Sequence, residues 1–303
     1  MPLWLSLAIF AQFLFALTVL VDKHVVVRVA HIGRPIVYTF VISILSGFVV
    51  VIAPFGLVSL PSADTLRLSV LYAVAFAGAL FFLYSSLRIA RASDVAPVVG
   101  AVSTITTLFL AGFLIEGDIR PSVIPPVMLL AAGTALISRF HFSRRALGRV
   151  LLSGFLFGLS VFVAKLVFFG VPFLDGFFWT RFMGVFVAFS FLVVPSWRNA
   201  IFYGGRNASS KGKALVVGNK VIGGGASILT AYAISLGSVS VVNALAGLQF
   251  VFLFIFALLF AKRMPALEEN GMPRGHGGWQ TGLGVALVAL GVALVYLTHA
   301  DLL

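Results

Sequence analysis

Residues 155–165, FLFGLSVFVAK, repeat a stretch that stands earlier in the chain at residues 13–23, FLFALTVLVDK. Seven of the eleven positions are identical, and both copies end in a lysine. Apolar identities carry little weight in a chain so rich in Phe, Leu and Val. A lysine inside or at the end of a long apolar run is costly in a bilayer, however, so its recurrence is informative. The two copies therefore predict an internal repeat.

The composition is that of a membrane protein. Of 303 residues, 61% are hydrophobic and 10% are charged, which is more apolar side chain than a soluble domain buries. A β-barrel strand alternates polar and apolar residues, whereas the apolar runs here do not alternate. We therefore expect an all-α integral membrane protein with ten transmembrane helices, since a crossing needs roughly 20 apolar residues. The predicted spans are 3–21, 35–59, 66–87, 95–115, 122–138, 150–174, 176–195, 214–236, 239–261 and 279–298.

Several classes of function are disfavoured. The formal net charge of +12 does not indicate nucleic-acid binding, because the basic residues lie in short loops between apolar runs. Without cysteine there is neither a disulfide nor a thiolate nucleophile. The histidines are scattered, and no HExxH, GxSxG or Walker A motif is present. We expect no enzyme activity, no cofactor, no bound metal and no ATP drive. The expected partners are a small-molecule substrate and the lipid bilayer.

The basic residues also predict an orientation in the cell (plasma) membrane. Loops that follow odd-numbered spans carry most of the Lys and Arg, whereas the other loops contain only Arg67 and Arg120. The positive-inside rule then places the odd-numbered loops in the cytoplasm and both termini outside.

The repeat extends beyond the two lysine-bearing stretches. Residues 40–52 align with 182–194 at the same offset, and residues 94–116 align with 240–262 at an offset four positions larger. A basic central loop divides the chain into two halves, each with five predicted spans. Because five is odd, the second half must enter the membrane in the opposite direction, which predicts an inverted-topology pair. The halves are residues 1–145 and 146–303.

The arrangement resembles the EamA-type branch of the drug/metabolite transporter superfamily, whose members are similar to two fused five-helix halves. The resemblance covers essentially the whole chain. It implies a metabolite transporter and termini in the cytoplasm; on that last point the charge distribution predicts the opposite, and we follow the charge. The residues that carry the resemblance are the two repeat copies, FFWTRFMG at 177–184, the segment 84–117 with Pro97 and Glu116, and the segment 218–260. The halves differ where Lys262 and Asn243 stand opposite Glu116 and Pro97.

Polar residues within the apolar runs are the candidate substrate-binding residues. Lys165 is flanked by apolar residues on both sides, and it could bind substrate or pair with Asp175 or a backbone carbonyl. Arg181 could be an aromatic-flanked anchor at the membrane interface, or it could bind a carboxylate or phosphate through its guanidinium. The full set is Lys165, Lys220, Arg181, Asn219, Asn243, Tyr84, Tyr232 and Lys23.

For the other candidates a structural role is also open. Lys23 stands beside Asp22 with a predicted loop directly after it, so it could anchor the helix at the interface. Asn219 and Lys220 precede three consecutive glycines, which could provide close packing or a ligand-binding break in the helix. We favour cavity lining for Asn243, although interhelical hydrogen bonding also suits it. The two tyrosines could line the cavity or pack against other rings.

These features predict a secondary transporter, ion-coupled or exchanging, that moves a small anionic or zwitterionic metabolite by alternating access through a central cavity. The hypothesis places Lys165 and Lys220 in that cavity, with Arg181 at one mouth. Two alternatives remain, a translocator or scramblase of lipids or lipid-linked sugars, and a non-transporting structural or receptor-like subunit. A homodimer could form through the small residues of span ten, although packing within the chain is an equal use for them. These residues are Gly282, Ala286, Ala289 and Ala293.

Overall fold

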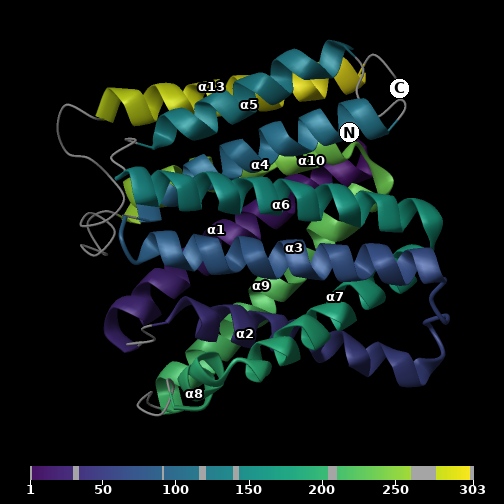
Figure 1. Ribbon diagram of the computed structural model, residues 1–303. Coiled ribbons are helices and arrows are strands. Elements are labelled where there is room, and N and C mark those ends of the chain that lie inside the picture. Colours follow the sequence, from purple (N-terminus) through teal and green to yellow (C-terminus); the bar gives the residue numbers. More distant parts are fainter. Residues whose placement is uncertain are drawn as a thin grey trace.

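A computed structural model describes residues 2–29, 34–90, 92–115, 121–138, 143–203, 210–260 and 278–300. Within these ranges every regular element is a helix, and long helices run across the molecule side by side (Figure 1). The helices of the first half are α1 (Leu3–Val29), α2 (Pro35–Ser46), η1 (Gly47–Phe55), α3 (Ala63–Leu87), α4 (Ala92–Leu114), η2 (Pro121–Val123) and α5 (Ile124–Ile137). Those of the second half are α6 (Arg144–Gly170), α7 (Phe173–Ser190), η3 (Phe191–Val193), α8 (Pro195–Tyr203), α9 (Ser210–Leu236), α10 (Val239–Ala244), η4 (Leu245–Gly247), α11 (Leu248–Phe260) and α13 (Gly278–Ala300).

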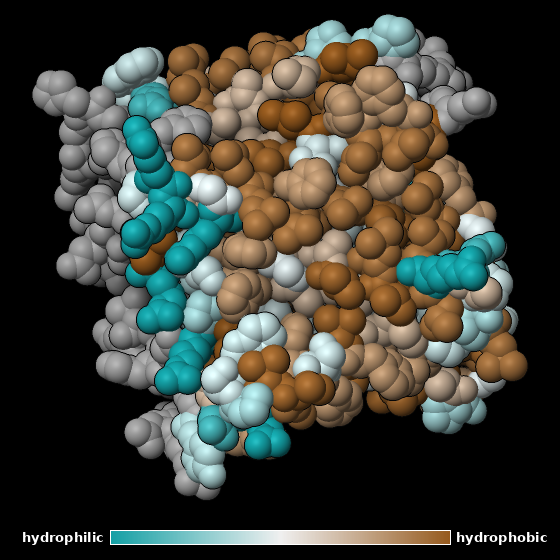
Figure 2. Space-filling model, in the orientation of Figure 1, coloured by the Kyte–Doolittle hydropathy of each residue, from teal (hydrophilic) through white to brown (hydrophobic). Residues whose placement is uncertain are grey.

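The described part of the chain contains seven helical segments that are long and apolar enough to cross a membrane. Two shorter apolar helices, Leu3–Val19 and Pro121–Ile137, accompany them. The face in Figure 2 is correspondingly apolar across its middle, with most hydrophilic side chains along the left edge and a smaller group at the right edge. The protein is therefore an all-α, multi-pass membrane protein.

Several helix boundaries differ from the sequence prediction. Residues 195–203 form a short helix, α8, where a loop was predicted, because Pro195 suits a first helical turn and Ala200 packs into a small core with Ile36 and Val37. Helix α1 continues to Val29, so the predicted loop after Lys23 is wrong. No Gly or Pro interrupts the chain between Leu3 and Gly33, which is why the helix does not stop earlier. The ninth predicted span is divided into α10, η4 and α11.

Helix α6, which contains the second copy of the repeated stretch, packs closely against α4. A Cβ atom added to Gly154 would lie 2.6 Å from the Val102 side chain, and one added to Gly158 would lie 2.6 Å from the Ser103 carbonyl oxygen. Small residues let two helix backbones approach in a bilayer, where packing rather than water drives association. The Ser153 hydroxyl donates a hydrogen bond to the Ala79 carbonyl on α3, which joins α6 to a third helix.

Helices α5 and α13 form an antiparallel pair at one side of the bundle (Figure 1). A Cβ atom on Gly133 would meet the Gly284 backbone at 2.8 Å, and one on Gly291 would meet Leu130, earlier in α5, at 2.8 Å. At the end of the pair, the Gln280 amide donates to the carbonyls of Leu136 and Ser138 at 3.1 and 3.0 Å.

The stripe predicted for dimerisation lies outside this seam. Ala286, Ala289 and Ala293 are exposed, and a Cβ atom on Gly282 would meet nothing within 4 Å. The stripe takes no part in the packing on α5, because that contact uses the other face of α13. Dimerisation through the stripe stays a prediction.

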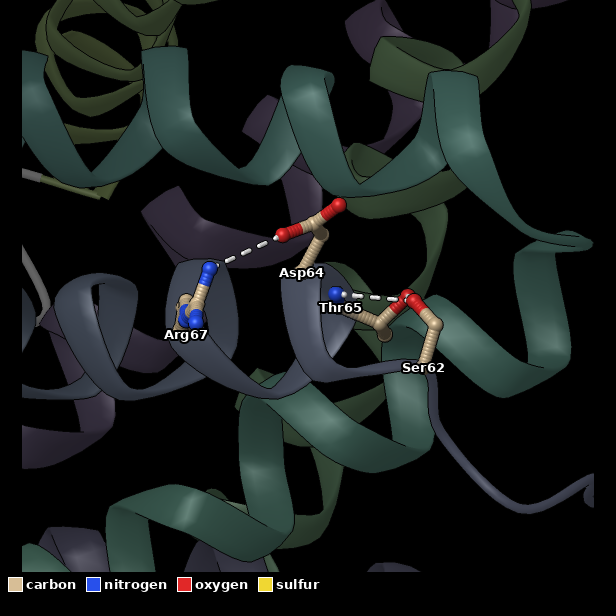
Figure 3. Close-up of polar contacts among 4 residues, drawn as sticks. All are labelled: Ser62, Asp64, Thr65 and Arg67. Carbon is tan, nitrogen blue, oxygen red and sulfur yellow. Dashed lines mark hydrogen bonds and ion pairs between the residues drawn. The ribbon is translucent and has the colours of Figure 1, made fainter.

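Helix α3 begins with a well-formed cap, shown in Figure 3. The Thr65 amide donates to the Ser62 hydroxyl at 3.1 Å, which satisfies one of the backbone donors that a helix start leaves open. One turn later Arg67 pairs with Asp64 at 3.3 Å, with both side chains well exposed. The first turn of α3 thus carries polar and charged side chains, and the apolar body of the helix follows it.

Candidate functional site

Arg181 lies among three helices and is held by neutral groups. Its guanidinium donates to the Tyr72 hydroxyl of α3 at 2.6 Å and to the Ser227 hydroxyl of α9 at 2.9 Å. It also lies 5.3 to 5.7 Å from the ring centroids of Tyr72, Phe76 and Phe177. Among the described residues, the ion pair is between Arg67 and Asp64. No carboxylate of a described residue therefore pairs with Arg181.

The start of α7 is fixed against the segment that precedes α3. Pro172 stands just before the helix, and the buried Asp175 carboxylate accepts the Ser59 amide hydrogen at 2.7 Å. The Trp179 indole nitrogen donates to the Ser59 carbonyl at 3.0 Å. These two bonds fix the position of α7 along its axis and its rotation about that axis. Arg181 then points toward α3. Asp175 is therefore not the partner of Lys165.

The Arg181 site lies deep within the bundle. Arg181, Tyr72 and Ser227 are eight, nine and nine residues from the same-side ends of α7, α3 and α9. At a rise of about 1.5 Å per residue, each is about 12 to 14 Å from its helix end. Half the hydrocarbon thickness of a bilayer is about 15 Å. Arg181 is therefore well inside the bundle and away from the helix ends, which does not suit the interface-anchor interpretation.

Clefts open at both ends of the helices that hold Arg181. One, of about 600 Å³, is lined by the start of α7 and the end of α9, and includes Asp175 and Tyr232. Stacked and tilted rings connect it to the site: Tyr232 contacts Phe173, Phe173 contacts Phe177, and Phe177 faces the guanidinium. The other, of about 840 Å³, is lined by the last turns of α3 and by α8.

Lys165 has a different environment. Its side chain is 5% exposed, and its amine donates to the Ile234 carbonyl at 2.9 Å and to the Gly237 carbonyl at 2.7 Å. The Phe169 ring lies 4.7 Å from the nitrogen. Both carbonyls belong to the end of α9, where the helix leaves acceptors without intrahelical donors and where its dipole favours a cation. Lys165 therefore caps α9, and its role in substrate binding stays a prediction.

Asn243 joins three helices through a buried polar network. Its amide donates to the Ser103 hydroxyl at 3.0 Å and to the Thr107 hydroxyl at 2.8 Å, both on α4. The Thr107 hydroxyl also lies within hydrogen-bonding distance of the Gly158 carbonyl on α6, at 3.2 Å. This network is interhelical hydrogen bonding, the second of the two roles that suited Asn243. Asn243 stands near the end of α10, just before η4 separates α10 from α11.

The remaining predicted residues are dispersed. Tyr84 stacks on Tyr38 with centroids 4.8 Å apart, and the Asn219 amide donates to the Thr18 carbonyl at 3.0 Å. Lys220 is partly exposed on α9. Lys23 falls within α1, and its side chain is outside the described residues. Of the predicted set, Arg181 and Tyr232 are thus linked through rings, and the others lie in separate contacts.

Sequence reasoning missed Tyr72, Ser227 and the face of Phe177 as parts of the site. Tyr72 stands in an apolar run and Ser227 follows a glycine cluster, and neither belongs to a recognisable motif. The signal that could have found Tyr72 is its hydroxyl, since a buried phenol needs a hydrogen-bond partner. Across the described ranges no group of three or more His, Cys, Asp or Glu residues could hold a metal ion.

Comparison with known proteins identifies the fold alone. No protein-family model and no curated protein matches the chain. Among solved structures, 28 chains match it. One, titled only as the crystal structure of a protein, has a TM-score of 0.69 at 16% sequence identity, over 97% of this chain and 98% of that one. The chain therefore shares its fold with that protein over nearly the full length of both.

Proposed function

We propose that the protein is a secondary transporter similar to the EamA-type drug/metabolite transporters, with ten membrane crossings in two inverted five-helix halves. It moves a small anionic or zwitterionic metabolite by alternating access. The observation that carries this proposal is Arg181, whose guanidinium lies well inside the bundle and contacts two hydroxyls and three rings. A partly buried cation in an apolar bundle is expensive unless it is neutralised, and a substrate carboxylate or phosphate would neutralise it.

The directions of the helices support the inverted repeat. By their place between the aligned segments, α3 and α9 are equivalent helices of the two halves, and α6 touches the C-terminal ends of both. Arg149, near the start of α6, donates to the Ser85 carbonyl of α3, whereas Lys165 holds the end of α9. These two residues are 16 positions apart, or about 24 Å along a helix. Helices α3 and α9 therefore end at opposite sides of the bundle, as an inverted repeat requires.

The packing partners support it as well. If each helix is replaced by its equivalent in the other half, several helix pairs in contact become helix pairs that are also in contact. Helix α3 packs on α6 and α9 packs on α1, while α4 packs on α6 and α11 packs on α1. The pairs α5 with α13 and α2 with α7 each consist of equivalent helices, and both pairs are in contact. This exchange is the pattern that a two-fold axis between the halves produces, and the opposite directions of α3 and α9 suit an axis in the membrane plane.

The site also suits alternating access. The deep guanidinium lies between a cleft at one end and a cleft at the other, and aromatic rings stand between it and the first cleft. We assign the basic end, with Arg34, Arg88 and Arg149, to the cytoplasm, and the two termini to the outside. The test is a fusion at Leu303 to a reporter that works only in the cytoplasm. Activity of this reporter would contradict the orientation.

A thermal-shift screen of the purified protein tests the proposed function. The compounds are amino acids, mono- and dicarboxylates and organic phosphates, each applied to wild type, Arg181→Gln and Arg67→Gln. We expect at least one anionic or zwitterionic compound to stabilise wild type and Arg67→Gln but not Arg181→Gln, and to be taken up by proteoliposomes that contain wild type. A compound that is bound but never moved by wild type would contradict transport, and a shift that survives in Arg181→Gln would contradict the site.

A further inference from the structure

The larger cleft lies at the basic end of the bundle, away from Arg181. Its volume is about 840 Å³, and it is bordered by three arginines from three different elements. Arg34 precedes α2, Arg88 follows α3, and Arg149 stands in the second turn of α6. Among the residues that the structure describes, no Asp or Glu lines the cleft. Because the arginines come from distant parts of the sequence, the fold brings their charges to one opening.

The inner wall of the cleft is apolar and aromatic. Phe81 and Phe82 of α3, Ile36 of α2 and Trp197 of α8 line it. The Trp197 ring contacts the rings of Phe81 and Phe191, with centroids 6.3 and 5.9 Å away. The cleft thus offers positive charge at the rim and apolar surface below it.

Helix α8 places the cleft at the boundary between the hydrocarbon and water. It is a short helix whose exposed residues include Trp197, Phe202 and Tyr203 beside Arg198. Tryptophan and tyrosine gather at the headgroup level of membranes, and such helices lie along the interface. The hydrophilic edge next to a broad apolar face in Figure 2 fits this placement.

We infer that this cleft binds the headgroup of an anionic phospholipid. Guanidinium groups match phosphate geometry through paired hydrogen bonds. The Arg149 guanidinium donates to the Ser85 carbonyl through one nitrogen at 3.3 Å, which leaves further donors on the same group. The apolar wall receives the glycerol and upper acyl region of the lipid. A soluble anion would use the arginines alone, so the two surfaces together select a lipid.

A lipid in this position has a structural consequence. It would contact α2, α3, α6 and α8 at once, and it would offset the mutual repulsion of three like charges. The inference does not depend on Arg181 or on the identity of the substrate, because Arg34, Arg88 and Arg149 are at the opposite end of α3 from the α7 and α9 ends that lead to Arg181.

Native mass spectrometry and thermal unfolding of purified protein test the inference. The added ligands are phosphatidylglycerol, phosphatidylcholine and glycerol 3-phosphate, the last as a soluble anion with the same phosphate. The test variant is Arg34→Gln with Arg88→Gln. The matched control is Arg67→Gln with Arg198→Gln, which removes the same charge from two exposed arginines that do not line the cleft.

We expect wild type to bind one phosphatidylglycerol at least tenfold more tightly than phosphatidylcholine, with a matching rise in unfolding temperature. The test variant should lose this preference at least tenfold, and the control should keep it within twofold. Equal binding of the two lipids, equal loss in the control, or equal stabilisation by glycerol 3-phosphate would each overturn the inference. The wild-type comparison needs no variant, so it decides the matter even if the test variant does not fold.

Discussion

Lys165 and Arg181 are both cations inside the apolar part of the bundle, and both stood out in the sequence for that reason. Their surroundings differ. The Lys165 amine is held by two backbone carbonyls at the end of α9, whereas the Arg181 guanidinium is held by two hydroxyls and faces three rings. Carbonyl groups at a helix end already carry partial negative charge, but hydroxyls and rings neutralise a cation only weakly. A cation held by carbonyls at a helix end thus suits a structural role. A cation held by hydroxyls and rings is better suited to bind a further anionic group.

The largest effect on stability should follow from Lys165→Met. This change leaves the Ile234 and Gly237 carbonyls buried without their donor, at a cost of about 1 to 3 kcal/mol for each acceptor. We expect the free energy of unfolding to fall by about 2 to 6 kcal/mol, measured by thermal or denaturant unfolding in detergent. Lys165→Gln, which keeps one donor group, should lose less. Unchanged stability in Lys165→Met would show that Lys165 does not cap α9.

A smaller loss should follow from Gly158→Ala, which damages packing without altering charge. The added Cβ would lie 2.6 Å from the Ser103 carbonyl and from the Thr106 Cβ, so α4 and α6 must separate. Overpacking of this kind costs about 1 to 3 kcal/mol. The matched control is Gly148→Ala on the same helix, where a Cβ meets nothing within 4 Å and helix propensity favours alanine. Equal unfolding temperatures for the two variants would contradict the close α4 and α6 contact.

A still smaller effect on stability should follow from Tyr72→Phe. The ring that faces Arg181 is kept, but the hydroxyl that accepts at 2.6 Å is removed. We expect a loss of about 1 kcal/mol in stability, and an apparent affinity for the screened compound that falls about three- to tenfold because the guanidinium is less well positioned. Titration of the thermal shift measures both quantities. An unchanged affinity would show that Tyr72 does not position Arg181.

Much of the architecture could be predicted from the sequence. The apolar runs located the helices, because a bilayer requires about 20 apolar residues per crossing. The prediction was wrong where a boundary depends on a local effect, as in α8 and in the continuation of α1 past Lys23. The site could be predicted only in part. Arg181 was visible because it is a charged residue in an apolar run, but Tyr72 and Ser227 are ordinary in composition and become relevant only when α3, α7 and α9 meet.

The central claim is that Arg181 binds the anionic group of the substrate while Lys165 holds the end of α9. The most direct test is the affinity of Arg181→Gln and Lys165→Gln for the compound identified by the screen, measured with the unfolding temperature of each variant without ligand. We predict that Arg181→Gln stays close to wild type in unfolding temperature, because removal of a charge from an apolar site offsets the lost hydrogen bonds. It should lose at least tenfold in affinity, about 1.4 kcal/mol. Lys165→Gln should unfold at a lower temperature and keep its affinity within threefold. The opposite pattern, with affinity lost in Lys165→Gln and retained in Arg181→Gln, would contradict the claim.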